Sequence, residues 1–210
     1  MNEPVAVAVL AKAPIAGFAK TRLIPVLGAR GAAVLQGRLI ERAVETACAA
    51  AVGPVTLWTT PDESHPTFQS IATRLRIALA RQAEGDLGAR MLAAIAAANR
   101  PVLVIGSDCP ALTSDHLRAA ADVLRGRAPA VVVPAEDGGY TLIGLRAPEP
   151  VLFADMPWGT SGVMDETRRR LRTLGLAWHE PVTLWDVDLP EDLERMRESG
   201  LHELIPARSS

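Results

Sequence analysis

The sequence is almost free of lysine. Only Lys12 and Lys20 are lysines among 22 basic residues, and arginine fills every other basic position. Two lysines within nine residues of each other indicate a place that requires a compact ammonium group rather than a planar guanidinium. The stretch that holds them is therefore the first candidate site.

Cysteine, histidine and long apolar segments are also scarce. Cys48 and Cys109 are the only cysteines, too few and too differently placed for a disulfide framework. The four histidines are scattered, so we expect no zinc site. The apolar run at residues 5–11 follows no basic segment and is too short for a signal or membrane-spanning segment. We expect a cytoplasmic protein that does not bind membranes.

Several common motifs are missing. The chain has no G-x-G-x-x-G, which argues against a nicotinamide-binding Rossmann domain, and no P-loop. G-x-S-x-G is absent too, and Cys109 has no evident histidine partner, so we interpret it as a small packed residue. A formal net charge of -2 argues against a nucleic-acid-binding protein.

What the sequence does contain is an alternation of strand and helix patterns over 210 residues. Strands are predicted at residues 5–11, 55–59, 76–80, 102–105, 130–134 and 183–188. Helices are predicted at 29–50, 66–75, 89–99, 113–125 and 163–174, with a short one from Pro190. This order predicts a single α/β domain over residues 1–210 with a mainly parallel sheet, and a frayed tail from about residue 206.

The strand at residues 102–105 organises the candidate site. Its four apolar residues predict a strand buried on both faces, and Gly106, Ser107 and Asp108 follow directly. Ligands of open α/β sheets bind outside the carboxyl ends of the strands, which gives Asp108 a functional position. The alternative is that Ser107 and Asp108 cap a turn.

Cations follow the first strand. Lys12, Lys20 and Arg22 lie in one loop with Gly17, an arrangement that suits phosphate binding. The alternative is a solvated basic loop. Gly85 and Asp86 precede a predicted helix, where they either cap it or approach a nucleotide.

Further polar groups follow the later strands. Gly138 and Gly139 open a backbone path that leaves room for a ligand, although a hairpin turn explains them equally well. Asp186 and Asp188 share one face of the last predicted strand, with Val187 opposite; Asp188 is alternatively the cap of the helix at Pro190. Carboxylates together with lysine and arginine suit a polyphosphate bound to Mg²⁺.

Taken together, these motifs resemble a known family. The matching segments are Lys12-x-Pro14-x-x-Gly17-x-x-Lys20-Thr21-Arg22-Leu23, Gly106-Ser107-Asp108-Cys109-Pro110, Asp137-Gly138-Gly139-Tyr140, Trp158-x-Thr160-Ser161 and Asp186-Val187-Asp188. They resemble a bacterial family of GT-A-fold proteins labelled glycosyltransferases, some linked to arsenosugar biosynthesis. The chain is similar more distantly to molybdenum-cofactor guanylyltransferases and to 2-phospholactate guanylyltransferase. The resemblance extends from about residue 5 to residue 198.

The resemblance implies a Rossmann-like nucleotide-diphosphosugar transferase fold, a three-layer sandwich, with the nucleotide over the first half of the sheet. The catalytic residues would be Lys20, Arg22 and Asp108. The loop from Ala11 to Arg22 would hold the phosphates of the nucleotide, and the turn Gly85-Asp86-Leu87-Gly88 would lie near its base or ribose. The nucleotide-binding residues would be Ala11, Lys12, Gly17, Lys20, Arg22, Gly85, Asp86, Gly88 and Ser107. The substrate would contact Asp137, Gly138, Gly139, Tyr140, Trp158, Thr160 and Ser161.

The chain departs from the usual glycosyltransferase metal motif. It has Ser107-Asp108-Cys109 where that motif is Asp-x-Asp, so the first carboxylate is missing. Asp108 then corresponds to one ligand of Mg²⁺ or Mn²⁺, and Asp186 or Asp188 supplies the other. We expect Asp188 rather than Asp186, because it lies nearer the carboxyl end of the predicted strand.

Three functions remain open. The first is a metal-dependent glycosyltransferase that uses a nucleotide-diphosphosugar, placed first on the resemblance. The second is a nucleotidyltransferase that uses a nucleoside triphosphate and releases pyrophosphate, which the basic loop favours. The third is a nucleotide-binding protein without turnover. In the two enzyme readings the partners are a nucleotide donor and a small-molecule acceptor.

Overall fold

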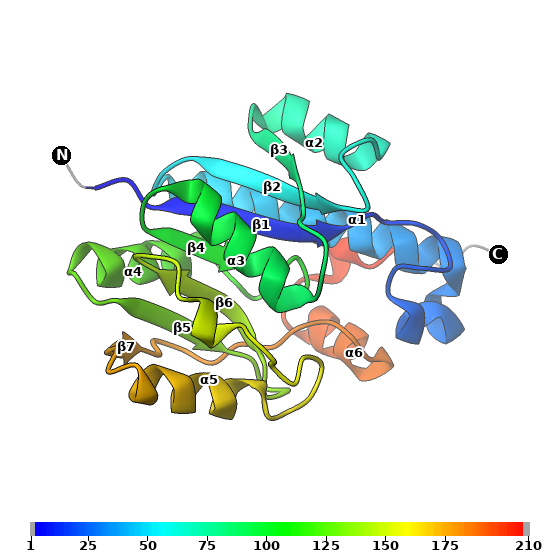
Figure 1. The fold of residues 1–210 in the computed structure, drawn as a ribbon. Coiled ribbons are helices and arrows are strands. Elements are labelled where there is room, and N and C mark those ends of the chain that lie inside the picture. Colours follow the sequence, from blue (N-terminus) through cyan, green and yellow to red (C-terminus); the bar gives the residue numbers. More distant parts are fainter. Residues whose placement is uncertain (1–2, 208–210) are drawn as a thin grey trace.

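The computed structural model describes residues 3–207, which build one seven-stranded sheet with helices on both faces (Figure 1). The strands are β1 (Ala6–Lys12), β2 (Val55–Thr60), β3 (Ala78–Arg81), β4 (Val102–Ile105), β5 (Ala130–Pro134), β6 (Tyr140–Leu145) and β7 (Trp178–His179). The α-helices are α1 (Ile24–Ala50), α2 (Pro66–Leu75), α3 (Leu87–Ala98), α4 (Ser114–Arg125), α5 (Val163–Thr173) and α6 (Pro190–Glu198). Three short 3-10 helices are η1 (Thr21–Leu23), η2 (Pro150–Leu152) and η3 (His202–Leu204).

The strand order is β3-β2-β1-β4-β6-β5-β7. Four of the pairings are parallel, and β6 is antiparallel to both of its neighbours, β4 and β5. The expected α/β fold with a mainly parallel sheet is therefore confirmed. The hairpin interpretation of the segment at residues 135–139 is also correct, because β5 and β6 are antiparallel partners joined by it.

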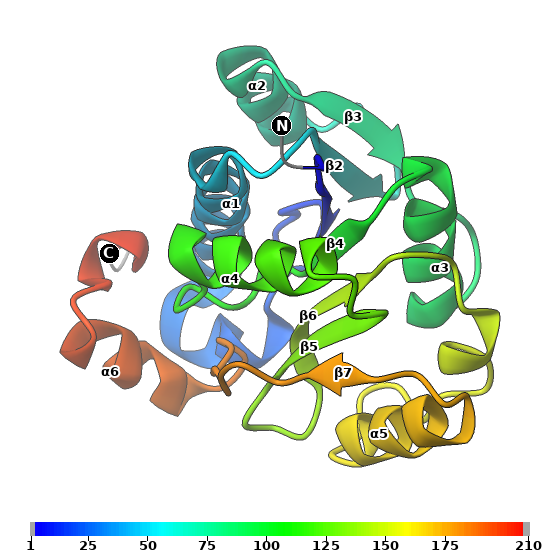
Figure 2. The same cartoon turned by 90° about the vertical axis from the view of Figure 1, so that its left-hand side faces the viewer.

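Alternating side chains divide the core into two layers. In β1, Val7 and Val9 pack with α1, α2 and α4, whereas Ala8 and Leu10 face α3, α5 and η2. This alternation is what the period of two in a strand requires when both faces are covered. Figure 2 shows α1 and α4 on one side of the sheet and α3 on the other, which gives the expected three layers.

Helix α1 is the longest element, and the stretch Thr21–Ala50 is long and apolar enough to span a membrane by length and composition alone. In the structure Leu35, Ile40 and Val44 are fully buried in the core clusters. Gly28, with φ 70° and ψ 164°, interrupts the helix, so its regular part begins at about residue 29, as predicted. We interpret α1 as a core helix.

One predicted strand is wrong. Residues 183–188 form an extended segment that makes only a single bridge, between Leu184 and Ala135, and the last strand is β7 at Trp178–His179. Elsewhere the bounds agree within a few residues; β3 begins at Ala78 rather than at Arg76, which ends α2 in a left-handed conformation. Of the tail predicted to fray, residues 208–210 lie outside the described residues.

Candidate active site

The first and fourth strands bring the two main candidate segments together. β1 is the parallel neighbour of both β2 and β4, with Val9 opposite Ile105. After β1 the chain continues through α1 to β2 and β3 on one side of β1, and it then returns through α3 to β4 on the other side. The carboxyl ends of β1 and β4 therefore border a switch point of the sheet. The loop that carries both lysines follows β1, and Asp108 follows β4.

Lys20 holds these two segments together. Its ammonium lies 2.9 Å from Asp108 Oδ1 and donates a hydrogen bond to the carbonyl oxygen of Val187. The side chain is only 4% exposed. Lys20 has a left-handed backbone (φ 47°) at the start of η1. Such a conformation in a residue other than glycine is unfavourable by roughly 1–2 kcal/mol, so other contacts must hold it.

Asp108 is fixed from its other side by a short chain of hydrogen bonds. Gln36 Nε2 donates to Ser107 Oγ at 3.0 Å, and Ser107 Oγ donates to Asp108 Oδ1 at 3.1 Å. Gln36 and Ser107 are buried, whereas the side chain of Asp108 is 49% exposed. Ser107 thus orients the carboxylate, which faces solvent and remains accessible to a ligand.

The segment that holds Asp186 and Asp188 lies beside Asp108. The backbone N–H of Val187 donates to the Asp108 carbonyl oxygen at 2.8 Å, and the Val187 side chain is fully buried. Asp188 forms an ion pair with Arg22. The alternative role of Asp188 as the cap of α6 is wrong, because Leu189 is the N-cap residue, and the carboxylate of Asp192 accepts from the backbone N–H groups of Asp188 and Leu189 just before the helix.

Two hollows meet at this point. The first has a volume of about 410 Å³, and we call it the basic hollow. It is lined by Lys12, Lys20, Arg22 and Arg90, together with Ala11, Phe18, Gln36, Gln82, Leu87, Ser107 and others. Four cations and two carboxylates, Asp108 and Asp188, leave this lining positive. Phe18, which is 67% exposed, adds an apolar side chain.

The second hollow, of about 390 Å³, we call the acidic hollow. Its charged lining consists of Asp108, Asp137, Asp186 and Asp188, and none of the described residues that line it is lysine, arginine or histidine. Its other lining residues include Cys109, Gly139, Tyr140, Thr141, Trp158, Gly159 and Thr160. Leu87, Gly106, Asp108 and Asp188 line both hollows, so the two are adjacent. A third hollow, at the interruption of α1, contains none of the predicted residues.

Burial and charge alter acidities in the acidic hollow. Burial, followed by the negative charges of Asp137 and Asp108, raises the pKa of Asp186 to about 6. Burial raises the pKa of the Cys109 thiol to about 12, which agrees with a packed and unreactive cysteine. The pKa of Tyr140 is raised by burial as well, so its hydroxyl stays protonated.

The two aromatic residues of the acidic hollow pack against each other. The rings of Tyr140 and Trp158 are edge to face, with centroids 6.3 Å apart. Among the residues that the structure describes, Trp158 Nε1 is the one buried side-chain polar atom without a hydrogen-bond partner. Such an unpaired buried donor is unfavourable by about 1–3 kcal/mol.

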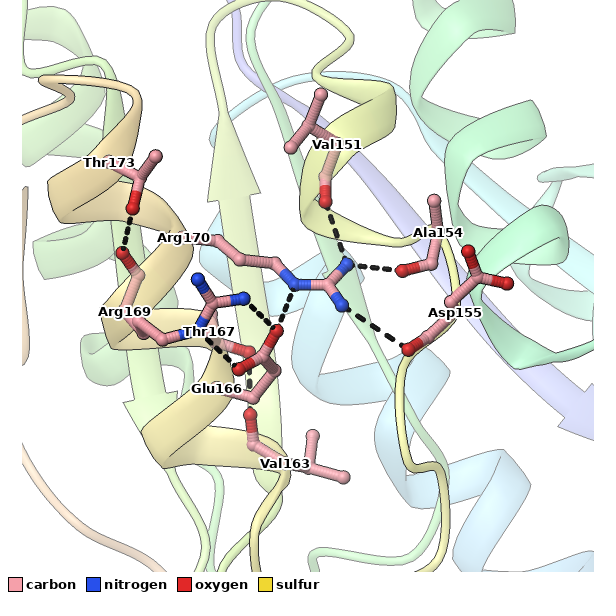
Figure 3. Close-up of polar contacts among 9 residues, drawn as sticks. All are labelled: Val151, Ala154, Asp155, Val163, Glu166, Thr167, Arg169, Arg170 and Thr173. Atoms are coloured by element: carbon pink, nitrogen blue, oxygen red, sulfur yellow. Dashed lines mark hydrogen bonds and ion pairs between the residues drawn. The ribbon is translucent and has the colours of Figure 1, made fainter.

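A buried arginine positions the loop that carries Trp158. Figure 3 shows Arg170 of α5 donating to the carbonyl oxygens of Val151, Ala154 and Asp155 and to the carboxylate of Glu166. Its side chain is only 11% exposed. These contacts attach the chain after η2 to α5, and so fix the start of the loop from which Trp158 extends.

Several predicted residues do not line either hollow. Asp86 caps α3 by accepting from Ala89 N at 2.8 Å, as its alternative interpretation expected. At Gly88 an added Cβ would lie 2.6 Å from Phe153 O, and at Gly138 (φ 92°) it would lie 2.2 Å from Ser161 O. Gly88, Gly138 and Ser161 thus meet other protein groups at close range rather than leaving space for a ligand. Gly17 and Gly85, both with positive φ, are also outside the two linings.

Other lining residues were missed by the sequence analysis. Gln82 lines the basic hollow, and its amide nitrogen donates to Ala11 O at 3.1 Å and to Trp58 O at 2.9 Å. It directly follows β3, so its place at a strand end was a usable signal. Arg90, in the second turn of α3, and Gln36, in the middle of α1, carried no signal, because only the packing of their helices brings them to the hollow.

The structure resembles known nucleotide-dependent enzymes. A Desulfovibrio desulfuricans G20 protein named "putative nucleotide-diphospho-sugar transferase" is 26% identical, with a TM-score of 0.82, over 97% of this chain and 94% of that chain. A CMP:2-keto-3-deoxy-manno-octonic acid synthetase in complex with CTP is 13% identical, with a TM-score of 0.58, over 95% and 99%. Glucosyl-3-phosphoglycerate synthase from Mycobacterium tuberculosis, in complex with Mn²⁺, UDP and glucosyl-3-phosphoglycerate, is 11% identical, with a TM-score of 0.56, over 98% and 81%.

These similarities confirm the nucleotide-diphosphosugar transferase fold expected from the sequence motifs. The names of the neighbours agree with the predicted class, a transferase that uses a nucleotide-activated donor. No curated protein matches the chain in sequence. A family model described as "Uncharacterized protein conserved in bacteria (DUF2064)" matches residues 43–160, more than half of the chain. The chain therefore belongs to the DUF2064 family of bacterial proteins.

Proposed function

We propose that this protein is a glycosyltransferase that takes a sugar from a nucleotide-diphosphosugar. The observation that carries the proposal is the meeting of two oppositely charged hollows at Asp108 and Asp188. A donor diphosphate suits the cations of the basic hollow, and the sugar and acceptor suit the adjoining acidic hollow. The Desulfovibrio neighbour, named for a nucleotide-diphospho-sugar, supports this choice of donor.

A divalent cation fits the carboxylates between the hollows. Asp108, Asp186 and Asp188 supply hard oxygen donors along one hollow. The raised pKa of Asp186 reflects burial first and then neighbouring negative charge, which a cation would offset. No group of three or more His, Cys, Asp or Glu residues in the described chain is arranged as a complete metal site. Mg²⁺ suits such a partial set, because it takes one or two carboxylates and completes its shell with water and phosphate oxygens.

We propose that Asp108 and Asp188 hold this ion, since both line the two hollows, whereas Asp186 lines only the acidic one. The Mn²⁺ bound in the Mycobacterium neighbour supports a divalent cation of this kind. When bound, the ion would supply positive charge to the diphosphate.

The cationic side chains of the basic hollow would stabilise the negative charge that develops during the reaction. In glycosyl transfer the oxygen of an acceptor hydroxyl bonds to the anomeric carbon of the sugar and gives up its proton to water, while the bond from that carbon to the diphosphate oxygen breaks. Negative charge develops on the leaving diphosphate, and Lys12, Lys20 and Arg22 are placed to stabilise it. The buried Lys20 is the best oriented of the three, because Val187 and Asp108 already fix its ammonium.

Nucleotidyl transfer is the second candidate. Its support is the concentration of four cations in the basic hollow, which suits a triphosphate, and the CTP-bound synthetase among the structural neighbours. In that reaction the bond after the α-phosphate breaks and pyrophosphate leaves. The two candidates therefore release different products.

The test measures both products. The protein is incubated with Mg²⁺ or Mn²⁺, pooled acceptors and either a nucleotide-diphosphosugar or a nucleoside triphosphate. We expect acceptor-dependent nucleoside diphosphate from a sugar donor, lost in Lys20→Met and kept in Arg100→Met, a control at the opposite end of the sheet. Acceptor-dependent pyrophosphate from a triphosphate, with no nucleoside diphosphate from any sugar donor, would replace sugar transfer by nucleotidyl transfer.

A further inference from the structure

The acidic hollow has a charge pattern that limits what can bind in it. Four carboxylates line it, and two of them, Asp108 and Asp188, form ion pairs with Lys20 and Arg22. Asp137 and Asp186 form no ion pair with any cation of the described chain. No basic residue lines this hollow, so neither carboxylate has an ion-pair partner in its lining.

The neutral part of the hollow has a different character. Tyr140 and Trp158 supply adjoining aromatic rings, and Trp158 Nε1 is a buried donor that still lacks an acceptor. Thr141 and Thr160 add hydroxyl groups. Rings of this kind suit the C–H face of a polyol or sugar, and carboxylates and hydroxyls accept or exchange hydrogen bonds with its O–H groups.

We propose that the acidic hollow selects an acceptor without phosphate or carboxylate groups, a hydroxyl-bearing molecule that is uncharged or carries an amine. This inference rests on the proposed function, because it names the second substrate of the same site. An anionic acceptor would lie beside the carboxylates of Asp137 and Asp186, and the lining has no basic side chain with which it could form an ion pair. The basic hollow has the cations that such an anion needs, but the donor phosphates require them.

The inference predicts a difference between matched compounds. The probes are glucose, glucosamine, ribose and glycerol, compared with glucose 6-phosphate, glucuronate, ribose 5-phosphate and 3-phosphoglycerate. Their binding to the full-length protein without donor is measured by ligand-observed saturation-transfer NMR, once with Mg²⁺ and once with EDTA. We expect members of the first group to bind more tightly than their anionic counterparts in either condition.

Three variants locate the effect. Trp158→Ala should abolish the signals of the bound neutral probes, whereas Trp178→Ala, a change at β7 outside the two linings, should not. Asp137→Asn combined with Asp186→Asn removes both carboxylates. At position 137 the Asn amide oxygen can still accept from Gly139 N, a bond that Asp137 makes at 2.8 Å. Anionic probes should bind this double variant about three- to tenfold more tightly than they bind the parent.

The proposal is wrong if the phosphorylated or carboxylated probes bind the parent more tightly than their neutral counterparts, or if no uncharged or amine-bearing probe binds. It is also wrong if removing both carboxylates leaves the affinity for anions unchanged. Nucleotide binding to the basic hollow is measured separately by calorimetry. A protein that binds nucleotide but prefers anionic probes contradicts this inference alone, whereas one that binds no nucleotide contradicts the proposed function.

Discussion

The ion pair between Lys20 and Asp108 should stabilise the fold as well as the site. In Asp108→Ala the Lys20 ammonium, only 4% exposed, keeps the Val187 carbonyl as its partner but loses its counter-charge. Breaking one side of a fully buried pair typically destabilises a protein by about 3–5 kcal/mol. Because the side chain of Asp108 is 49% exposed, water can replace part of the interaction. We therefore expect Asp108→Ala to lower the free energy of unfolding by about 1–3 kcal/mol.

A double-mutant cycle isolates this interaction. Lys20→Met removes the buried charge, so the double variant Lys20→Met/Asp108→Ala should be less destabilised than the sum of the two single changes, with a coupling energy of about 1–3 kcal/mol. The assay is equilibrium unfolding in urea. Arg74 and Glu45, an exposed pair 2.9 Å apart, provide the control cycle, for which we expect no more than about 1 kcal/mol. Additive effects of Lys20→Met and Asp108→Ala would refute the role that we assign to this pair.

Three further predictions follow from single contacts. Arg22→Gln removes the exposed partner of Asp188; urea unfolding should change by less than about 1 kcal/mol, while calorimetry should detect weaker nucleotide binding. Gly138→Ala places a Cβ 2.2 Å from Ser161 O at a positive φ and should destabilise the protein by about 2–5 kcal/mol. Gly159 also has a positive φ but has open space around it, so Gly159→Ala should destabilise the protein only by the roughly 1–2 kcal/mol of backbone strain. Equal losses of stability in urea unfolding would contradict the packing argument. Hydrogen bonds from Arg169 and Arg170 lower the pKa of Glu166 to about 2 from 4.5. The stabilisation by the Glu166 carboxylate is thus complete above about pH 4.5 and is lost as the pH falls toward 2. The stability difference between the parent and Glu166→Gln should therefore shrink over that range, and it would stay constant if the carboxylate were unpaired.

Local sequence patterns were sufficient for most of the fold. The helix at 66–75 and the strands at 102–105 and 130–134 have the predicted bounds, because their apolar periodicity and caps agree with their tertiary surroundings. The segment at 183–188 failed for a specific reason. It has a strand-like alternation, but it packs against Asp108 and the end of β5 through isolated hydrogen bonds rather than along a complete neighbouring strand.

The site was only partly predictable. Positions at strand ends identified Lys12, Lys20, Arg22, Asp108 and the acidic pair, and the structure places all of these around two adjacent hollows. The pairing of Lys20 with Asp108 was not predictable, because it depends on the left-handed backbone of Lys20 and joins residues distant in sequence. The separation into a basic and an acidic hollow was not predictable either, because it also depends on which residues distant in sequence the fold brings together.

The proposed function requires that the basic hollow bind the phosphates of a nucleotide together with a divalent cation. The most direct measurement is calorimetric titration of nucleoside diphosphates of each base into the parent, Lys20→Met and Arg100→Met, with Mg²⁺ and with EDTA. We expect one or more nucleotides to bind the parent and Arg100→Met in Mg²⁺. Binding should be weakened by EDTA and by Lys20→Met, the latter by about 1.5–3 kcal/mol. Nucleotide binding of equal strength in Lys20→Met and the parent, or with Mg²⁺ and with EDTA, would contradict it.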